Sequence, residues 1–426
     1  MDTDCCQMDN SADSPCFREG ENKSKMSIAH CEALALFKKQ ISDIRTEYDT
    51  DLQLTKVLRA RNFNLKKAEK LFREIYCCRQ MFEADTIVTT YKKIEVLEKY
   101  EYNGFMGFAK NGTPIRYISV GSGDPMGFLK SMSGYELSNF FVYMMLSDIL
   151  AARKESEKRG KEIMEITYVL DLTGFSIQDH LRECILEIAL DVTSIFQEYY
   201  PEIWSNVLFV NASYVFHKFY NILKPIIRDD MLKKIEIVSS ESTAELLLKY
   251  IDEDVLPEFL GGKRRDSKGD PMCKEFLRFG GRIPEKYYLS NRHPLLSSDP
   301  GASSRLISAK SCFNFPVVVR KPGSKISLEF RTEGGSISFI ILHRKFGPDT
   351  EILDLPTSDE NLNEKDENSS FQAVISAFRV QTHLAPVDEK IKAPWTGVYV
   401  FKFSNSSSWF MSRRLIYRIK LIEPES

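Results

Sequence analysis

The stretch that decides the fold runs from Phe196 to Ser240 and reads FQEYYPEIWSNVLFVNASYVFHKFYNILKPIIRDDMLKKIEIVSS. A short continuous apolar run, Val207 to Val210, is typical of a strand buried on both faces. Ser213 has the side chain of a helix N-cap, and Pro225 interrupts the helix that follows. The run from Ile235 to Val238 supplies a second strand. A strand, a helix and a strand in this order predict a right-handed crossover between parallel strands.

The helix of this crossover is apolar around most of its circumference. Such a helix must be buried on most sides, or must face something apolar that is not protein. Two interpretations stay open at this point: an ordinary crossover helix in an α/β core, or a lid over a lipid pocket. The apolar residues concerned are Tyr214, Val215, Phe216, Phe219, Tyr220, Ile222 and Leu223.

Length and composition bound the class of protein. A chain of 426 residues predicts two or three domains. The net charge of −2 gives no global attraction to nucleic acid or to an anionic membrane, so any basic surface must be local. Residues 1–26 are polar, lack the apolar core of a signal peptide and are predicted to be a disordered tail. No run approaches the ~18–20 apolar residues of a membrane span, which predicts a soluble protein that meets membranes only peripherally.

The residues that carry catalytic or metal chemistry form no recognisable constellation. None of the six histidines is paired at metal-ligand spacing, and Gly121-Ser122-Gly123 is not a nucleophile elbow. We therefore predict no enzyme, no metal and no cofactor, and no nucleic-acid partner. The nine cysteines are odd in number and contain no C-x-x-C spacing, which favours the reducing cytosol over a disulfide scaffold. They are Cys5, Cys6, Cys16, Cys31, Cys77, Cys78, Cys184, Cys273 and Cys312.

Periodicity divides the chain into a helical module over 27–84, an α/β domain over 90–263, a Pro- and Gly-rich linker over 264–292 and a β-rich domain over 293–426. Asn-Gly at positions 111 and 112 predicts a two-residue hairpin turn. Residues 347–370 hold eight acidic residues against Lys365 and predict a surface insertion. The expected helices are 28–46, 52–61, 65–82, 91–100, 133–158, 178–199, 213–228 and 241–250. The expected strands are 104–109, 114–120, 165–171, 207–210, 235–238, 315–319, 325–331, 336–343, 371–380, 397–403 and 415–422.

Several clusters carry a resemblance to the CRAL-TRIO lipid-binding family. They are L-R-A-R-N-F at 58–63, Y-Y-P-E at 199–202, V-N-A at 210–212, N-I-L-K-P at 221–225, K-K-I at 233–235 and D-V-L-P-E-F-L-G-G at 254–262. Residues 396–405, with Pro322-Gly323 ahead of them, resemble the core of GOLD domains. The resemblance implies an α/β CRAL-TRIO domain with an N-terminal helical module, followed by an all-β GOLD sandwich. It also implies that the 213–228 helix is a mobile gate.

The resemblance further implies a head-group site for an inositol phosphate at Arg61, Glu202 and Lys234. A structural salt bridge between Glu202 and one of these cations is the alternative. The positions that contact phosphatidylcholine in relatives hold Ile166 and Tyr168 here instead of small hydroxyl residues. This difference favours relatives that bind apolar ligands such as tocopherol or squalene as well as phosphoinositide.

The remaining candidate residues fall into two groups. The pocket and gate residues have packed core as their alternative, and the basic residues near the gate have a solvated helix face as theirs. Expected in the pocket and gate are Tyr168, Leu170, Phe209, Phe216, Phe219, Tyr220 and Leu223, with Val169 and Val207 beside them. Expected to face the membrane are Lys218, Lys224, Arg228 and Lys233.

Together these observations favour a cytosolic lipid-binding and transfer protein that associates transiently with intracellular membranes. A diacyl lipid leaving a bilayer exposes some 30 methylenes at ~0.8 kcal/mol each, roughly 24 kcal/mol, and an apolar cavity lowers that barrier. The ligand would be a phospholipid or an isoprenoid. The alternative is an adaptor that transfers no lipid and uses its GOLD surface to bind a protein or a membrane.

Overall fold

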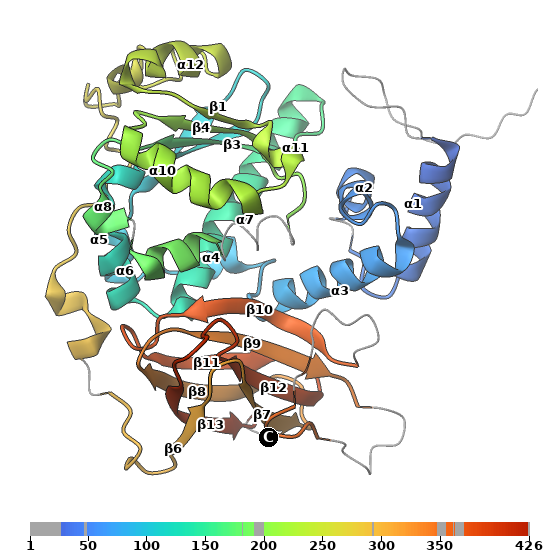
Figure 1. Cartoon of the computed structure of the whole chain (residues 1–426). Helices are drawn as coiled ribbons and strands as arrows, with labels where there is room; N and C mark the ends of the chain where they lie inside the picture. The colour runs from blue at the N-terminus through green and yellow to red at the C-terminus, as the bar shows by residue number, and fades with distance from the viewer. Residues whose placement is uncertain are drawn as a thin grey trace, which may run out of the picture.

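The computed structural model describes residues 27–46, 49–180, 182–190, 200–291, 294–346, 355–360, 362 and 370–424. Figure 1 shows an α/β domain, a group of helices beside it and a β-sandwich below. The expected tail at 1–26 and most of the acidic insertion at 347–370 lie outside the described residues.

Three helices form the N-terminal module: α1 (Ile28–Gln40), α2 (Asp51–Ala60) and α3 (Leu65–Met81). Each begins at a side chain that accepts a backbone N–H: Ser27, Thr50 and Asn64. These caps fix where the helices start, because the first turn has no internal acceptors for its amides. The apolar faces of the three helices meet in one small core around Phe37, Leu54 and Leu71.

The α/β domain is built on a five-stranded sheet in the order β1-β2-β3-β4-β5. β1 and β2 are antiparallel, and the remaining neighbours are parallel, as the crossover pattern predicted. Figure 1 shows α12 on one face of the sheet and α7 and α10 on the other. The strands are β1 (Asn103–Phe108), β2 (Pro114–Ile118), β3 (Ile166–Asp171), β4 (Trp204–Val210) and β5 (Ile235–Ile237). The helices are α4 (Ile87–Thr90), α5 (Glu95–Tyr100), α6 (Pro125–Ser131), α7 (Gly134–Arg159), α8 (Ile177–His180), α10 (Tyr214–Leu223), α11 (Asp229–Leu232) and α12 (Thr243–Tyr250).

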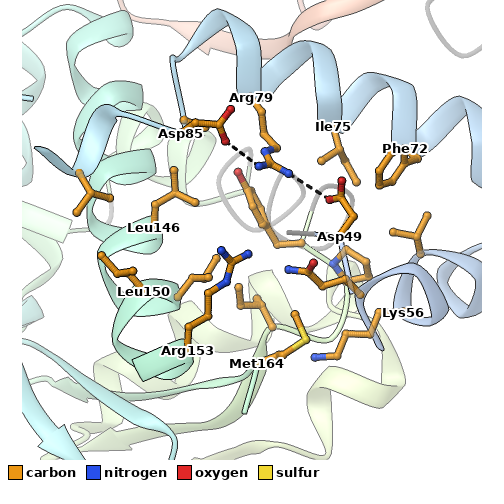
Figure 2. Close-up of a pocket in the computed structure, with 18 of the residues that line it drawn as sticks. Asp49, Lys56, Phe72, Ile75, Arg79, Asp85, Leu146, Leu150, Arg153 and Met164 are labelled. Atoms are coloured by element: carbon orange, nitrogen blue, oxygen red, sulfur yellow. Dashed lines mark hydrogen bonds and ion pairs between the residues drawn. The ribbon is translucent and has the colours of Figure 1, made fainter. Parts of the chain in front are cut away.

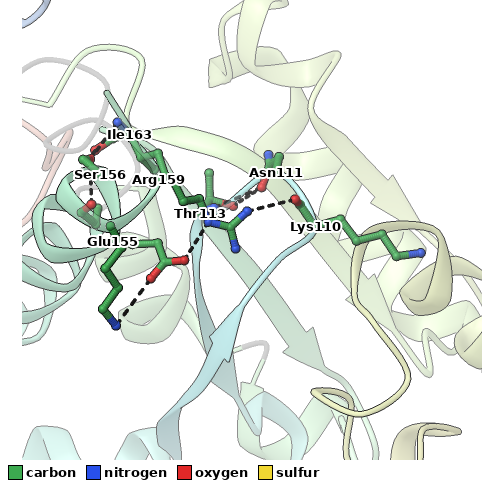
Figure 3. A network of polar contacts seen from close by, with 9 residues as sticks. Lys110, Asn111, Thr113, Glu155, Ser156, Arg159 and Ile163 are labelled. Carbon is green, nitrogen blue, oxygen red and sulfur yellow. Dashed lines mark hydrogen bonds and ion pairs between the residues drawn. The ribbon is translucent and has the colours of Figure 1, made fainter. Parts of the chain in front are cut away.

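The first hairpin forms where it was expected, but its turn differs from the prediction. Gly112 has a positive φ and Asn111 does not, and five residues separate β1 from β2. The side chain of Asn111 instead accepts hydrogen bonds from the backbone and hydroxyl of Thr113, at 3.1 and 2.8 Å. Figure 3 shows that Arg159, at the end of α7, also reaches this turn and donates to the carbonyl of Lys110. The turn is therefore shaped by side-chain hydrogen bonds as well as by glycine.

The segment expected to be a linker packs against the α/β domain. Cys273, Leu277 and Ile283 are buried, and Leu277 forms an isolated bridge with Gly104 of β1. The prediction of a linker over 264–292 was therefore wrong for its first part. Its Pro and Gly content breaks regular structure, yet the apolar residues between them cover the sheet core.

The C-terminal domain contains two four-stranded antiparallel sheets, in the orders β10-β9-β12-β7 and β11-β8-β13-β6. The all-β prediction is confirmed as a pair of sheets, and two strands were missed. β11 is rich in charge and β6 is almost wholly exposed, so neither shows the expected apolar alternation. The strands are β6 (Ser303–Ile307), β7 (Cys312–Val319), β8 (Ser324–Glu333), β9 (Ile337–Arg344), β10 (Gln372–Val380), β11 (Val387–Ala393), β12 (Gly397–Ser404) and β13 (Arg413–Ile422).

The sandwich is joined to the rest of the chain through α3, which lies along β10 (Figure 1). Cys77 and Met81 of this helix are buried in the same apolar cluster as the sandwich core. The ammonium of Lys392 pairs with the carboxylate of Glu83 at 2.5 Å. The C-terminal sandwich therefore packs against the end of α3 and holds the helical module in position.

Candidate functional site

One face of the sheet is lined by apolar side chains and covered by α7 and α10. Tyr168 and Leu170 on β3 lie beside Val207 and Phe209 on β4, because the strands pair in that register. Alternate residues of a strand share a face, so Val169 points to the opposite side, where it joins the core under α12. Of the expected pocket residues, Tyr168, Leu170, Val207 and Phe209 share the α10 side of the sheet, and Val169 does not.

Helix α10 rests on this face through aromatic residues. Phe216 is 2 % exposed, and its ring centre lies 4.9 Å from that of Phe209. Phe219 is also buried, and Tyr220 is half-buried against the same cluster. The side chain of Leu223 lies outside the described residues. A short 3-10 turn at Lys224–Ile226 ends the helix where Pro225 was expected to interrupt it.

The outer face of α10 is exposed and mixed in character. Tyr214 is 74 % exposed, and Ile222 is also exposed. The four basic residues expected near the membrane, Lys218, Lys224, Arg228 and Lys233, are all exposed. Two have local contacts: the Lys218 ammonium lies 5.0 Å from the ring centre of Tyr214, and Arg228 pairs with Asp230.

A buried polar group lies on the same side of the sheet and was not anticipated from the sequence. Arg116 on β2 pairs with Asp148 on α7, and both are buried. Tyr168 is the neighbour of Arg116 in the strand register, and its buried hydroxyl has no hydrogen-bond partner in the described protein. Burial raises the pKa of Tyr168. The sequence did contain a signal for this pair: Arg116 stands in an apolar strand and Asp148 in an apolar helix. A buried charge requires a partner, so the two residues could have been paired.

The three residues expected to bind a head group take different positions. Glu202 pairs with Arg59 at 2.9 Å, so the partner comes from the first arginine of L-R-A-R. Arg61, the second, ends α2 and donates to the carbonyl of Ala60. Lys234 donates to the carbonyl of Trp204 and lies 3.6 Å from Glu165.

Lys56 belongs to this cluster and was missed. Its ammonium donates to the backbone carbonyl of Glu202 at 2.9 Å, and Glu202 itself has a positive φ of 54°. Burial lowers the pKa of Lys56, while Glu165 and Glu202 act in the opposite direction. The structure therefore brings Lys56, Arg59, Glu202 and Lys234 together at the amino ends of β4 and β5.

A cavity of about 390 Å³ lies beside this cluster, between the helical module and α7 (Figure 2). This volume falls within the ~300–1,000 Å³ typical of small-molecule sites. Figure 2 shows Arg79 between Asp49 and Asp85, with which it pairs, while Leu146 and Leu150 approach from α7. Its lining is mostly apolar, and the residues are Asp49, Gln53, Lys56, Val57, Phe72, Ile75, Arg79, Ala84, Asp85, Val88, Thr89, Leu146, Ile149, Leu150, Arg153, Met164, Tyr200, Pro201 and Ile203.

The described part of the chain contains neither a membrane-spanning helix nor a cluster of metal-ligating side chains. No helix there is both long and apolar enough to cross a bilayer. No group of three or more His, Cys, Asp or Glu side chains within those residues is arranged to hold a metal ion.

Comparison with known proteins finds similarity that includes the α/β domain. Residues 98–262 match the family model described as the CRAL/TRIO domain. Protein ctg-1 of Caenorhabditis elegans is 23 % identical over 328 residues, which span 77 % of this chain and 80 % of that protein. A solved structure described as the crystal structure of Sfh5 aligns with a TM-score of 0.48 at 17 % identity, covering 61 % of this chain and 95 % of the other. The match to a known family therefore lies in the α/β domain, whose residues 98–262 are similar to the CRAL/TRIO domain.

Proposed function

We propose that this protein is a cytosolic lipid carrier that takes a hydrophobic ligand between the apolar sheet face and α10, and exchanges it at intracellular membranes. The observation that carries the proposal is the position of α10. Its buried aromatic residues, Phe216 and Phe219, rest on the sheet face, and a Lys224–Ile226 turn ends it. A lid of this kind can leave the sheet if another apolar medium receives its inner face.

A membrane surface supplies that medium. The outer face of α10 already exposes Tyr214 and Ile222 beside the cations of Lys218 and Lys224. An amphipathic helix with cations on its polar side binds in the interface of an anionic bilayer, and each cation near that surface contributes about 1 kcal/mol. Opening of α10 and docking on the membrane would therefore favour each other.

For the ligand, the cluster at the amino ends of β4 and β5 supports a phosphoinositide. Lys56, Arg59 and Lys234 place three cations around Glu202, and Arg61 follows at the end of α2. Cations can bind a phosphodiester, and a carboxylate can accept from inositol hydroxyls. Under this proposal Lys234→Ala lowers phosphoinositide transfer and spares neutral ligands such as tocopherol or squalene. Equal transfer of both by this variant would remove Lys234 from the site.

The C-terminal sandwich is proposed to be a GOLD domain that contacts a membrane or a protein. Support comes from its two antiparallel sheets and from the 396–405 motif, which forms β12 at the centre of one sheet. The adaptor alternative keeps this domain as the principal interaction surface and gives the α/β domain no transfer role.

Lipid loading tests the carrier proposal. The full chain, purified from eukaryotic cells, is examined by native mass spectrometry, and its bound lipid is extracted and identified. Phe216→Asp places a charge in the lid contact and should abolish loading, whereas Leu36→Asp, which places the same charge at an exposed apolar position of α1, should load normally. Phe216→Met keeps a large apolar side chain and should retain loading, and thermal unfolding of the Phe216→Asp variant separates a lost pocket from a lost fold. Wild-type protein that carries no lipid and moves none between vesicles would favour the adaptor.

A further inference from the structure

The loop between β12 and β13, residues 405–412, holds three large apolar side chains out in water. Trp409 is 73 % exposed, Phe410 92 % and Met411 62 %. Single exposed apolar residues are common on protein surfaces, but a contiguous exposed set marks an interaction site. We call Trp409, Phe410 and Met411 the apolar tip.

Hydrogen bonds inside the loop hold the apolar tip in place. Asn405 is 2 % exposed, and its side-chain amide donates to the carbonyl of Met411 at 2.8 Å and to those of Ile307 and Ser308, both at 3.2 Å. The hydroxyl of Ser408 also donates to the carbonyl of Met411 and accepts from its amide. A loop fixed in this way loses little conformational freedom on binding, so its apolar side chains are presented ready for a partner.

A cation lies directly beside the apolar tip. The Lys310 ammonium is 3.6 Å from the ring centre of Trp409 and donates to the carbonyl of Ser406. Over the residues that the structure describes, no carboxylate pairs with Lys310. The neighbouring strands add Arg305 and Arg414, which pair with acidic residues. Lys310 thus leaves an unbalanced positive charge next to the exposed aromatic rings.

We propose that the apolar tip inserts into the interface of an anionic membrane and docks the carrier there. Tryptophan is enriched at the boundary between lipid and water, Phe410 would enter the acyl region, and Lys310 would meet anionic head groups. This docking role rests on the proposed function, because lipid exchange is what gives the protein a reason to contact a membrane. The tip itself binds no ligand for transfer.

The end of the sandwich that bears the apolar tip also contacts a helical segment that packs against α10. β10 and β12 both end opposite the start of β9. Gln381, just after β10, donates to the carboxylate of Glu187 at 2.8 Å. Glu187 belongs to a helical run, 183–190, whose Leu186 and Ala189 pack on the cluster of Phe216 and Phe219. One helical segment therefore connects the docking end of the sandwich to α10.

Quenching by brominated lipid tests insertion. The full chain is mixed with vesicles of phosphatidylcholine and phosphatidylserine whose acyl chains carry bromine, and tryptophan fluorescence is recorded. The chain has three tryptophans, so Trp409→Phe identifies the signal from position 409 while keeping the tip apolar. We expect wild-type fluorescence to be quenched and most of that quenching to be lost in Trp409→Phe. Equal quenching in both proteins would overturn the proposal.

Vesicle binding tests the contribution of the tip. Trp409→Ser combined with Phe410→Ser should weaken sedimentation with these vesicles by about tenfold for each aromatic removed. Ile28→Ser removes an equally exposed apolar side chain on α1, 81 % exposed, and should leave binding unchanged. Lys310→Gln should weaken binding to anionic vesicles and not to pure phosphatidylcholine.

Two further outcomes separate the possibilities. If the double variant binds vesicles as the wild type does but loses a protein partner, the tip is a protein-docking site and the membrane proposal is wrong. The same variant should still carry its lipid in native mass spectra, because the tip lies outside the pocket. Absence of lipid in the wild type would refute the carrier function without affecting the vesicle result.

Discussion

Replacing Tyr168 by phenylalanine removes one hydroxyl from the sheet face beneath α7 and α10. Tyr168 is buried, and its oxygen has no hydrogen-bond partner in the described protein. A buried polar group left without a partner costs about 1–3 kcal/mol. Tyr168→Phe should therefore increase the free energy of unfolding of the ligand-free protein by about that amount, which is the opposite of most core substitutions.

A matched control lies on the neighbouring strand. Tyr117 is also fully buried, but its hydroxyl donates to the carboxylate of Asp171 at 2.8 Å. Hydrogen bonds to charged groups contribute about 1.5–3 kcal/mol, so Tyr117→Phe should destabilise the protein by a similar amount. Both variants lose one tyrosine hydroxyl. The free energy of unfolding is expected to rise in Tyr168→Phe and to fall in Tyr117→Phe.

The assay is denaturant unfolding of delipidated protein, followed by tryptophan fluorescence, with the same measurement repeated after lipid loading. A bound ligand stabilises the folded state by an amount that grows with the logarithm of its affinity. If the ligand presents a polar group to Tyr168, the stabilising effect of the substitution should shrink or reverse in loaded protein. Destabilisation of the delipidated Tyr168→Phe variant to the same degree as Tyr117→Phe would refute the reasoning.

Three further outcomes are expected. Asp148→Ala should lower the free energy of unfolding by about 3–5 kcal/mol, since it leaves Arg116 buried without its partner; a loss below 1 kcal/mol in denaturant unfolding would contradict the burial of this pair. Arg59→Ala should cost at most about 1 kcal/mol in the same assay, because the Arg59–Glu202 pair is partly exposed, and a much larger loss would show that the pair is structural. Burial lowers the pKa of His343 to about 4, below its unfolded value near 6.5. The folded state thus favours neutral His343. The contribution of His343 to the free energy of unfolding is fully present above pH 6.5 and is lost as the pH falls to 4, a change of about 3 kcal/mol in all. His343→Gln should flatten this part of the pH profile in thermal unfolding, and an unchanged profile would exclude His343 as its cause.

Local patterns predicted most of the elements that build the site. The β4–α10–β5 crossover, helix α3 and the hairpin that opens the sheet all follow from residues close together in the chain. Strand β11 escaped prediction because its exposed positions are charged and its partner, β8, lies far away in the sequence. The segment after 263 was misjudged for a related reason, since its glycines and prolines are visible in the sequence and the core that it covers is not.

What the sequence by itself determined is the apolar helix at α10, the parallel crossover that contains it and the all-β character of the C-terminal domain, because each depends on a period of two or 3.6 residues. Only the tertiary structure decided which charges meet. Arg59 and Arg61 stand about 200° apart around a helix, so one of them at most can face the start of β4, and the docking of α2 on that edge selects Arg59 for Glu202. The cavity beside Lys56 and the apolar tip at Trp409 have the same origin, because enclosure and exposure are set by surfaces that come together only when distant segments pack.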